Sequence, residues 1–326
     1  MDTFLLPTGY NHMFMVRKIA RGFAYNGFKV KVVRKIEEIN DPGFIMTCDQ
    51  PVYYSLGARN NSKGDIRRII PGAIDRVDKF KLIRNISLKL QHEEYKKLAL
   101  QIKNRDIVVL GWFTYFDKKF FDDIKVNIIH MGEYFRGRPL WKEQLKWWKF
   151  YTNKKNNAFP LRFAADVDPN KIGVNCSNEK YFVSFVGDKL HHTDFYSLFL
   201  NDPKCKIVPT PPYISEIEKR NIYRNSTIGL GLHHEQNIVN RMVAERVFEI
   251  LAYGGVCLTD HPDAPKATDN CAIFVKSKKE LRDLIKKFKN NKDSMEELRK
   301  RGFKFTKKYG TWTARAKEII NFSKNI

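Results

Sequence analysis

The stretch ERVFEILAYGGVCLTD, residues 245–260, decides the fold class of this chain. Apolar residues recur at helical spacing up to Tyr253, two glycines follow, and an apolar strand then runs to Thr259. A helix that stops at glycine and leads directly into a buried strand is typical of a repeating α/β unit. Arg246 and Glu249 are three residues apart, so both side chains lie on one face of that helix.

The sequence around this stretch continues the alternation of strands and helices. Strands are predicted in KYFVSFVGDKL (180–190), at 206–208, in TIGLGLH (227–233) and in AIFV (272–275). A helix is predicted near 193–200, and lysine-rich amphipathic helices follow from about residue 276. Strands that alternate with helices in this way indicate a parallel sheet.

The first half of the chain shows the same organisation. A short apolar run at Phe4 to Leu6 precedes a helical pattern that ends at Asn26-Gly27, and a strand is predicted from Phe28 to Val33. Three further strands are predicted at 43–47, 107–110 and 126–129, with a helical segment at 92–104. This βαβ opening again predicts an α/β domain with a parallel sheet.

Two successive α/β domains are therefore expected. The predicted boundaries are 1–165 for the first domain, 166–310 for the second and 311–326 for a closing helix. The segment 163–173 contains a proline and little periodicity, which is typical of a link. Two such domains predict a cleft between them, with ligands at the carboxyl ends of the strands.

Composition narrows the class of protein. The chain has 326 residues, a formal charge of +23 and five scattered cysteines without a CxxC pair. No disulfide framework, zinc motif, signal peptide or membrane-spanning run is indicated, so we expect a cytoplasmic protein. Residues 1–165 carry 31 Lys and Arg against 16 Asp and Glu. That excess favours an anionic partner, although an AT-rich genome would produce a similar composition.

Arg246 and Glu249 suggest a specific chemistry. A guanidinium presents a planar set of donors that suits a phosphate. A carboxylate one turn later can accept the two hydroxyls of a ribose, so the pair can hold both halves of a nucleoside diphosphate. The alternative is an ordinary helix pair on a solvated face, which contributes only about 0.2–0.5 kcal/mol.

The segment NRMVAERVFEILAYGGVCLTD (240–260) resembles the C-terminal domain signature of GT-B glycosyltransferases, particularly the spore-maturation-like group. KYFVSFVGDK resembles the first strand and phosphate loop of that domain. VPTPPYISEIEKRNIYRNSTIGLGLH resembles its base-recognition turn, short helix and next strand, and YGTWTARAKEII resembles its closing helix. The similarity covers roughly residues 165–322, whereas the first half matches only in architecture. It implies the GT-B fold, in which two Rossmann-like α/β domains face each other across a cleft.

The resemblance implies a nucleotide-sugar donor, with UDP-sugar favoured, and no required cofactor. By it, Arg246 contacts the diphosphate and Glu249 the ribose. The turn at Tyr213-Ile214 contacts the base. Gly187 lets the backbone approach the phosphates, and Lys189 supplies charge there.

One position departs from the family pattern. Many retaining members carry a second glutamate eight residues before the one that matches Glu249, and this chain has Arg241 there. The retaining mechanism is therefore open, and Arg241 is interpreted as an additional phosphate contact.

Two residues are candidates for catalysis. His12 follows the glycine turn PTGYNHMF (7–14), in which Gly9 faces the predicted cleft, and it can act as a general base or touch the donor phosphate. Glu133 follows the strand at 126–129 and can take the proton of an acceptor hydroxyl in an inverting transfer. The alternatives are a helix-start histidine without a catalytic role and a loop glutamate paired with Arg136.

No metal site is expected. ADVDP (165–169) contains Asp-x-Asp, but it lies in the link, and GT-B enzymes do not need such a motif. The adjacent residues of HHE (233–235) cannot readily converge on one ion, and a loop near the donor sugar is the preferred interpretation.

The acceptor is left open by the sequence. The segment 59–89 holds nine Lys and Arg against three Asp and Glu, which suits an anionic acceptor such as a surface glycan or a lipid-linked saccharide. Peripheral contact with a membrane would follow from the same charge. Phage DNA β-glucosyltransferases are also GT-B proteins, so transfer to a hydroxymethylated, flipped-out base is an alternative. A non-catalytic nucleic-acid-binding protein with this fold is another.

Overall fold

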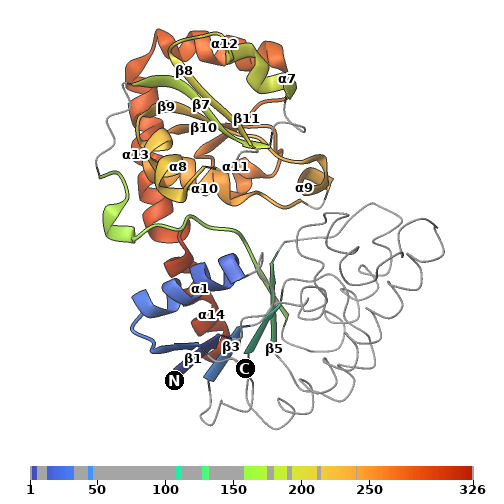
Figure 1. Cartoon of the computed structure of the whole chain (residues 1–326), viewed down its shortest axis with the longest axis vertical. Helices are drawn as coiled ribbons and strands as arrows, with labels where there is room; N and C mark the ends of the chain where they lie inside the picture. Colours follow the sequence, from blue (N-terminus) through green and yellow to red (C-terminus); the bar gives the residue numbers. More distant parts are fainter. Residues whose placement is uncertain are drawn as a thin grey trace, which may run out of the picture. The chain divides into compact units, whose positions relative to one another are not determined.

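The computed structural model describes residues 2–5, 13–32, 43–46, 108–111, 127–131, 158–174, 180–188, 193–210, 214–239 and 241–324 (Figure 1). The chain divides into two compact units. The first contains Met1–Met131, Leu140–Leu161 and Ala316–Ile326, and the second contains Gly132–Pro139 and Arg162–Arg315.

The described part of the first unit contains a parallel sheet of six strands in the order β2-β1-β3-β4-β5-β6. The strands are β1 (Asp2–Leu5), β2 (Val30–Val32), β3 (Gly43–Met46), β4 (Val108–Gly111), β5 (Asn127–Met131) and β6 (Ala158–Leu161). Helix α1 (Met13–Tyr25) joins β1 to β2, which confirms the predicted βαβ opening. It buries Ile19, Ala20 and Phe23, and the Phe23 ring meets Phe28 edge-on at 5.6 Å.

The second unit is built on a parallel sheet of five strands in the order β11-β10-β9-β7-β8. The strands are β7 (Tyr181–Asp188), β8 (Cys205–Thr210), β9 (Ser226–Gly231), β10 (Val256–Thr259) and β11 (Ala272–Phe274). From β7 the chain moves outward to β8 and then returns to the other side of β7 with β9. The direction of winding therefore reverses between β7 and β9, which makes this the topological switch point of the sheet.

Helices cover both faces of this second sheet, as Figure 1 shows, with α7 and α12 on one face and α8, α10 and α11 on the other. Short helical segments also follow the link and several strands. The helical elements are η4 (Pro169–Lys171), α7 (Thr193–Tyr196), η5 (Ser197–Phe199), α8 (Glu216–Arg224), α9 (Glu235–Val239), α10 (Glu245–Tyr253), α11 (Ala264–Ala267), α12 (Lys278–Lys289), α13 (Lys292–Tyr309) and α14 (Trp312–Lys324).

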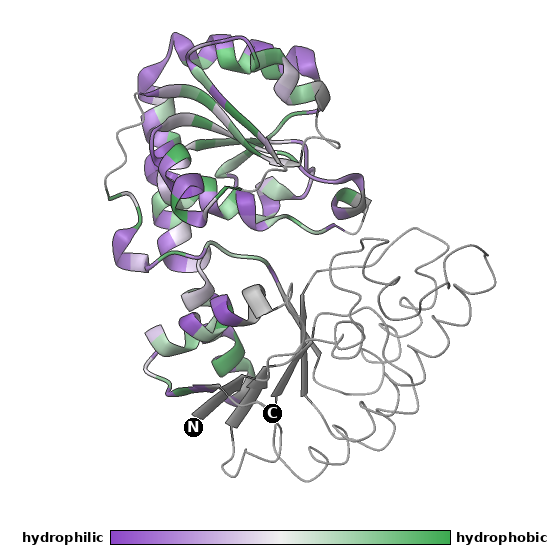
Figure 2. Cartoon of the chain, in the orientation of Figure 1, coloured by the Kyte–Doolittle hydropathy of each residue, from purple (hydrophilic) through white to green (hydrophobic). Residues whose placement is uncertain are grey.

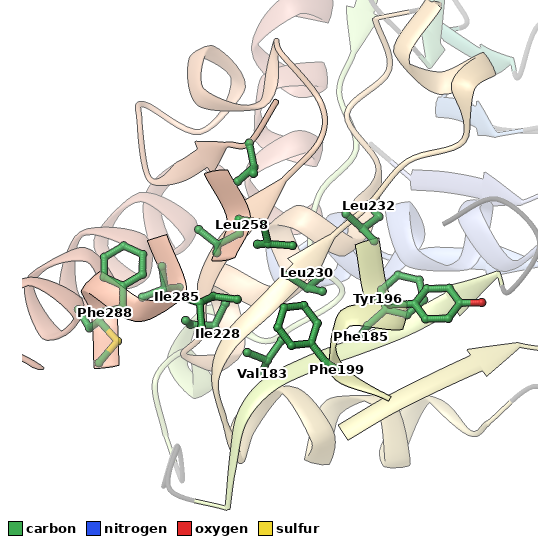
Figure 3. Packing of buried hydrophobic residues seen from close by; sticks show 14 residues of the cluster. Val183, Phe185, Tyr196, Phe199, Ile228, Leu230, Leu232, Leu258, Ile285 and Phe288 are labelled. Carbon is green, nitrogen blue, oxygen red and sulfur yellow. The ribbon is translucent and has the colours of Figure 1, made fainter. Parts of the chain in front are cut away.

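The apolar core of the second unit fills the space under α12 and α7. Phe185 stacks on Tyr196 with ring centroids 5.0 Å apart, and Ile285 and Phe288 of α12 join the strand residues (Figure 3). The outward side of α12 is hydrophilic, with its lysines exposed (Figure 2). This one-sided pattern holds the helix on the sheet by hydrophobic burial.

Strand β9 contains glycine on the opposite face because helix α10 approaches it closely. Ile228, Leu230 and Leu232 point into the core, while Gly229 and Gly231 alternate with them. A Cβ added at Gly229 would lie 2.6 Å from Cγ2 of Ile250, and one added at Gly231 would lie 3.0 Å from Cγ2 of Val247. Helix α10 then ends at Gly254, whose φ of 108° is the left-handed conformation that glycine adopts readily.

The entry and exit of the second unit lie side by side. The N–H of Ala165 donates to the carbonyl of Gly310 at 2.8 Å, and the N–H of Trp312 donates back to the carbonyl of Ala165 at 3.2 Å. The division between units falls at 161/162, a few residues before the predicted 165/166, because β6 extends the first sheet to Leu161. The predicted α/β class with parallel sheets is confirmed, and the helix predicted at 92–104 lies outside the described residues.

Candidate functional site

Arg246 lies across the carboxyl ends of two neighbouring strands. It is the second residue of α10, and its Nη1 donates to the carbonyl of Leu232, just beyond β9, at 2.6 Å. The guanidinium carbon lies 5.5 Å from the centre of the Phe185 ring in β7. A Cβ added at Gly187 would come within 2.8 Å of Arg246 Nη2, so glycine is the residue that leaves room for this guanidinium.

This position coincides with the switch point of the sheet. Gly187 is at the end of β7 and Leu232 follows β9, the two strands between which the winding reverses. Ligands of open α/β sheets bind outside the carboxyl ends of the strands at such a point. The structure thus brings together two of the predicted residues, Arg246 and Gly187, where a ligand is expected.

Glu249 lies inside the unit and is paired with a lysine. Only 2% of the residue is exposed, and its Oε1 is 3.0 Å from Nζ of Lys219 in α8. Lys219 also pairs with Glu216 at 3.0 Å. Burial is the largest single effect on Lys219 and lowers its pKa, but Glu249, Tyr223 and Glu216 together outweigh burial and raise the lysine pKa. The predicted ribose contact of Glu249 stays a prediction.

The phenol of Tyr223 lies in the same polar cluster. Tyr223 is 1% exposed, and within the described part of the chain its hydroxyl has no hydrogen-bond partner. Burial raises the pKa of this phenol, while the charge of Arg246 acts in the opposite direction. The charges of Arg246, Glu249 and Lys219 all act on this phenol, so the four polar side chains lie near one another.

A second polar group is built from histidines and aspartates in the loops after β9 and β10. Nδ1 of His233 is 2.9 Å from Oδ1 of Asp260, whose carboxylate also accepts from the backbone N–H of His233. Nε2 of His233 accepts from the backbone N–H of Ala244 at 2.9 Å. The ring of His261 meets that of His233 edge-on at 4.7 Å.

Burial holds both histidines neutral. It lowers the pKa of His233, although Asp260 opposes that shift. It lowers the pKa of His261 to about 4, and the neighbouring His233 adds to the effect. Nδ1 of His261 accepts from the N–H of Asp263 at 3.1 Å, a bond that a protonated ring cannot accept.

Arg241 forms a two-point ion pair rather than standing alone. Its Nε and Nη2 donate to the two carboxylate oxygens of Asp263 at 2.8 and 2.7 Å, and these bonds lower the pKa of Asp263. The backbone φ of Arg241 is 55°, which is uncommon for a residue with a side chain. Its predicted contact with a phosphate stays a prediction.

Of the remaining predicted site residues, Ile214 lies within the described part of the chain. Ile214 is half-buried immediately before Ser215, whose side chain caps α8 by accepting from the N–H of Glu218 at 3.1 Å. The other five lie outside the described residues: Gly9, His12, Glu133, Lys189 and Tyr213. Within the described ranges, no group of three or more His, Cys, Asp or Glu side chains is arranged to hold a metal ion. No helix in those ranges is long and apolar enough to cross a membrane.

The sequence does not identify four polar residues of these two groups: Lys219, Tyr223, His233 and Asp260. His233 was visible only as part of the HHE loop, and Lys219 precedes its partner Glu249 by 30 residues. Their roles depend on contacts between separate elements, which leave no periodic signal in the sequence.

Comparisons with known proteins relate part of the chain to one family model and the whole chain to a known fold. Residues 203–321 match the family model described as "Glycosyl transferase-like". A comparison with curated proteins finds no match.

Two solved structures are similar over nearly the whole chain. The UDP-forming α,α-trehalose-phosphate synthase from Burkholderia xenovorans has 9% identity and a TM-score of 0.51, with 100% of this chain and 99% of that one covered. The N-terminal domain of trehalose-6-phosphate phosphatase from Candida albicans has 8% identity and a TM-score of 0.55, with 99% and 96% covered. At these identities the similarity concerns the fold.

Proposed function

We propose that this chain, a glycosyltransferase of the GT-B fold, transfers a sugar from a nucleoside-diphosphate sugar held by its second unit. The observation that carries the proposal is the placement of Arg246 across the switch point of the sheet, against the bare backbone of Gly187. A guanidinium there is suited to the diphosphate, and the start of α10 adds the positive end of a helix dipole.

The chemistry of transfer follows from that placement. Breaking the bond between sugar and diphosphate develops negative charge on the leaving phosphate. Arg246 is fixed in advance by its bond to the Leu232 carbonyl, so it can neutralise that charge without reorganising. We propose that this replaces a divalent metal and that Lys189 assists. His12 and Glu133 stay candidates for taking the proton of the acceptor hydroxyl.

The donor and acceptor are proposed at a coarser level. UDP-sugar is the favoured donor, by the resemblance of the second half of the chain to its family. The net charge of +23 supports an anionic acceptor, such as a surface glycan or a lipid-linked saccharide. A cytoplasmic location, at the membrane surface for a lipid-linked acceptor, is part of the same proposal.

Nucleotide binding tests the proposal. Thermal unfolding of the wild type is measured with UDP, GDP, dTDP, ADP and CMP, each far above the expected Kd. A ligand at about 100 times its Kd stabilises the folded state by about 2.7 kcal/mol. Arg246→Ala should weaken the affinity for the active nucleotide about 10- to 100-fold, since a hydrogen bond to a charged group contributes about 1.5–3 kcal/mol.

Arg282→Ala is the matched control, because it removes an exposed arginine from α12 on the other face of the sheet. It should bind the nucleotide as the wild type does. A wild type that binds none of the five nucleotides contradicts the proposal. Salt-sensitive DNA binding that Arg246→Ala leaves unchanged would then favour the nucleic-acid-binding alternative.

A further inference from the structure

His233 accepts a hydrogen bond from Ala244, the N-cap residue of α10. This bond determines which ring nitrogen of His233 carries the proton. The N–H of Ala244 can only donate, so Nε2 of His233, at 2.9 Å, must be without a proton. The ring proton then lies on Nδ1, which donates to Asp260 at 2.9 Å. Asp260 is itself held by the backbone N–H of His233, at 2.9 and 3.1 Å to its two oxygens.

This bond supplies a cap that the sequence of α10 lacks. The N-cap residue is Ala244, which has no side-chain acceptor, and the third helical residue is Val247. In a capping box, a glutamate or glutamine at that third position accepts from the N–H of the N-cap residue. Valine cannot do so, and His233 provides the acceptor from another part of the chain.

The same loop also holds the guanidinium of the helix. Leu232, the residue before His233, accepts from Nη1 of Arg246 at 2.6 Å. Two consecutive residues thus fix both the backbone start of α10 and its phosphate-facing side chain. Through Asp260 this arrangement is tied to the end of β10, and through Gly187 it meets the end of β7.

We propose that His233 is a positioning residue for the donor site, and that Asp260 sets its tautomer. By accepting from Ala244, His233 fixes the start of α10 so that Arg246 is held beside Gly187 before the diphosphate arrives. Because a site that is already ordered loses less entropy on binding, this arrangement favours donor affinity. The proposal rests on the proposed function of the same edge of the sheet.

Two substitutions of His233 distinguish the role of its hydrogen bond with Ala244 from the role of the imidazole ring. In His233→Gln the side-chain oxygen can take the place of Nε2 and accept from Ala244. In His233→Asn the amide can still reach Asp260 but is too short for Ala244. A third variant, Asp260→Asn, removes the carboxylate that keeps the proton on Nδ1, so it should resemble His233→Asn.

The measurements are the Kd of the nucleotide that stabilises the wild type and the hydrogen exchange of the amides at 244–247. His233→Asn and Asp260→Asn should raise the Kd about tenfold and speed exchange at Ala244. His233→Gln should stay within about threefold of the wild type, since tenfold corresponds to about one hydrogen bond. Thr268→Val is the stability control. It removes the Thr268 hydroxyl from its bonds to Ala264 and Ala272, so unfolding should become easier with the Kd unchanged.

The outcomes are distinguishable. A wild type that binds no nucleotide removes the proposed function, and this proposal falls with it. If the wild type binds and His233→Asn binds equally well, only the positioning role is wrong. A Kd for His233→Gln as weak as that of His233→Asn would also overturn it, because the ring rather than the acceptor would then matter.

Discussion

Glu249 shows how one residue can carry a structural role that its motif does not reveal. The sequence predicts that Glu249, three residues after Arg246 on α10, binds ribose, and the structure shows that its carboxylate also pairs with Lys219 of α8 at 3.0 Å. The side chain of Glu249 is 3% exposed and that of Lys219 is 17% exposed. Removing one member of a buried ion pair leaves the other charge without compensation, which costs far more than losing a surface pair.

Glu249→Ala is therefore expected to destabilise the protein even without a ligand. The free energy of unfolding should fall by about 3 kcal/mol, the lower end for a broken buried pair, because Glu216 still pairs with Lys219. The measurement is urea denaturation followed by circular dichroism. Glu216→Ala is the matched control: its carboxylate is the 37% exposed partner of the same lysine and should cost less than about 1 kcal/mol. Equal losses for the two variants would show that the Glu249 pair is not effectively buried.

At the scale of elements, the packing of α10 on β9 sets the position of the site. The alternation of Ile228, Leu230 and Leu232 with Gly229 and Gly231 gives the strand one apolar face and one face without side chains. Helix α10 lies against the second face, and this close approach brings Arg246 to the strand ends. Its position therefore depends on residues that never touch the proposed ligand.

Gly229→Ala tests this dependence. The added Cβ would lie 2.6 to 2.9 Å from three side-chain carbons of Ile250, so the helix must move. We expect a loss of about 1–3 kcal/mol in the free energy of unfolding, as for other overpacked cores. Gly231→Ala is the control, since its nearest neighbours are at 3.0 Å. The prediction is wrong if denaturant unfolding gives Gly231→Ala the larger loss.

The elements themselves were largely predictable from the sequence. The runs at 181–188, 226–231 and 256–259 are apolar and bounded by turns, and each is a strand within a few residues of its prediction. Strand β6 was missed because Ala158–Leu161 is short and contains Pro160, which suits its place at the edge of the sheet. Arg246 and Gly187 could be chosen by motif. The partners Lys219, His233 and Asp260 could not, because their contacts join elements that are distant in sequence.

For the molecule as a whole, the two neutral histidines predict sensitivity to acid. Histidines in the unfolded chain protonate near pH 6.5, whereas His261 in the folded protein protonates only at about pH 4, and the pKa of His233 is also lowered. The unfolded state therefore binds more protons between these values. The stability that the neutral rings contribute is complete above about pH 6.5 and is lost as the pH falls toward 4.

Thermal unfolding from pH 7.5 to pH 4 in low salt measures this loss. His261→Asn keeps an acceptor near the position of Nδ1 for Asp263 but cannot be protonated. Its melting temperature should fall less steeply than that of the wild type over this range. Parallel curves for the two proteins would show that His261 does not contribute to the acid sensitivity.

The last helix returns the chain to the first unit. Residues up to 131 and those from 316 onward belong to the first unit, so Arg162–Arg315 is inserted into it rather than appended. The two ends of this insert meet where Ala165 bonds Gly310 and Trp312. Adjacent ends are what allow one domain to be carried within another. In evolutionary terms, the second unit is placed so that it can be exchanged as a cassette with two recombination points, leaving the flanking segments of the first unit in place.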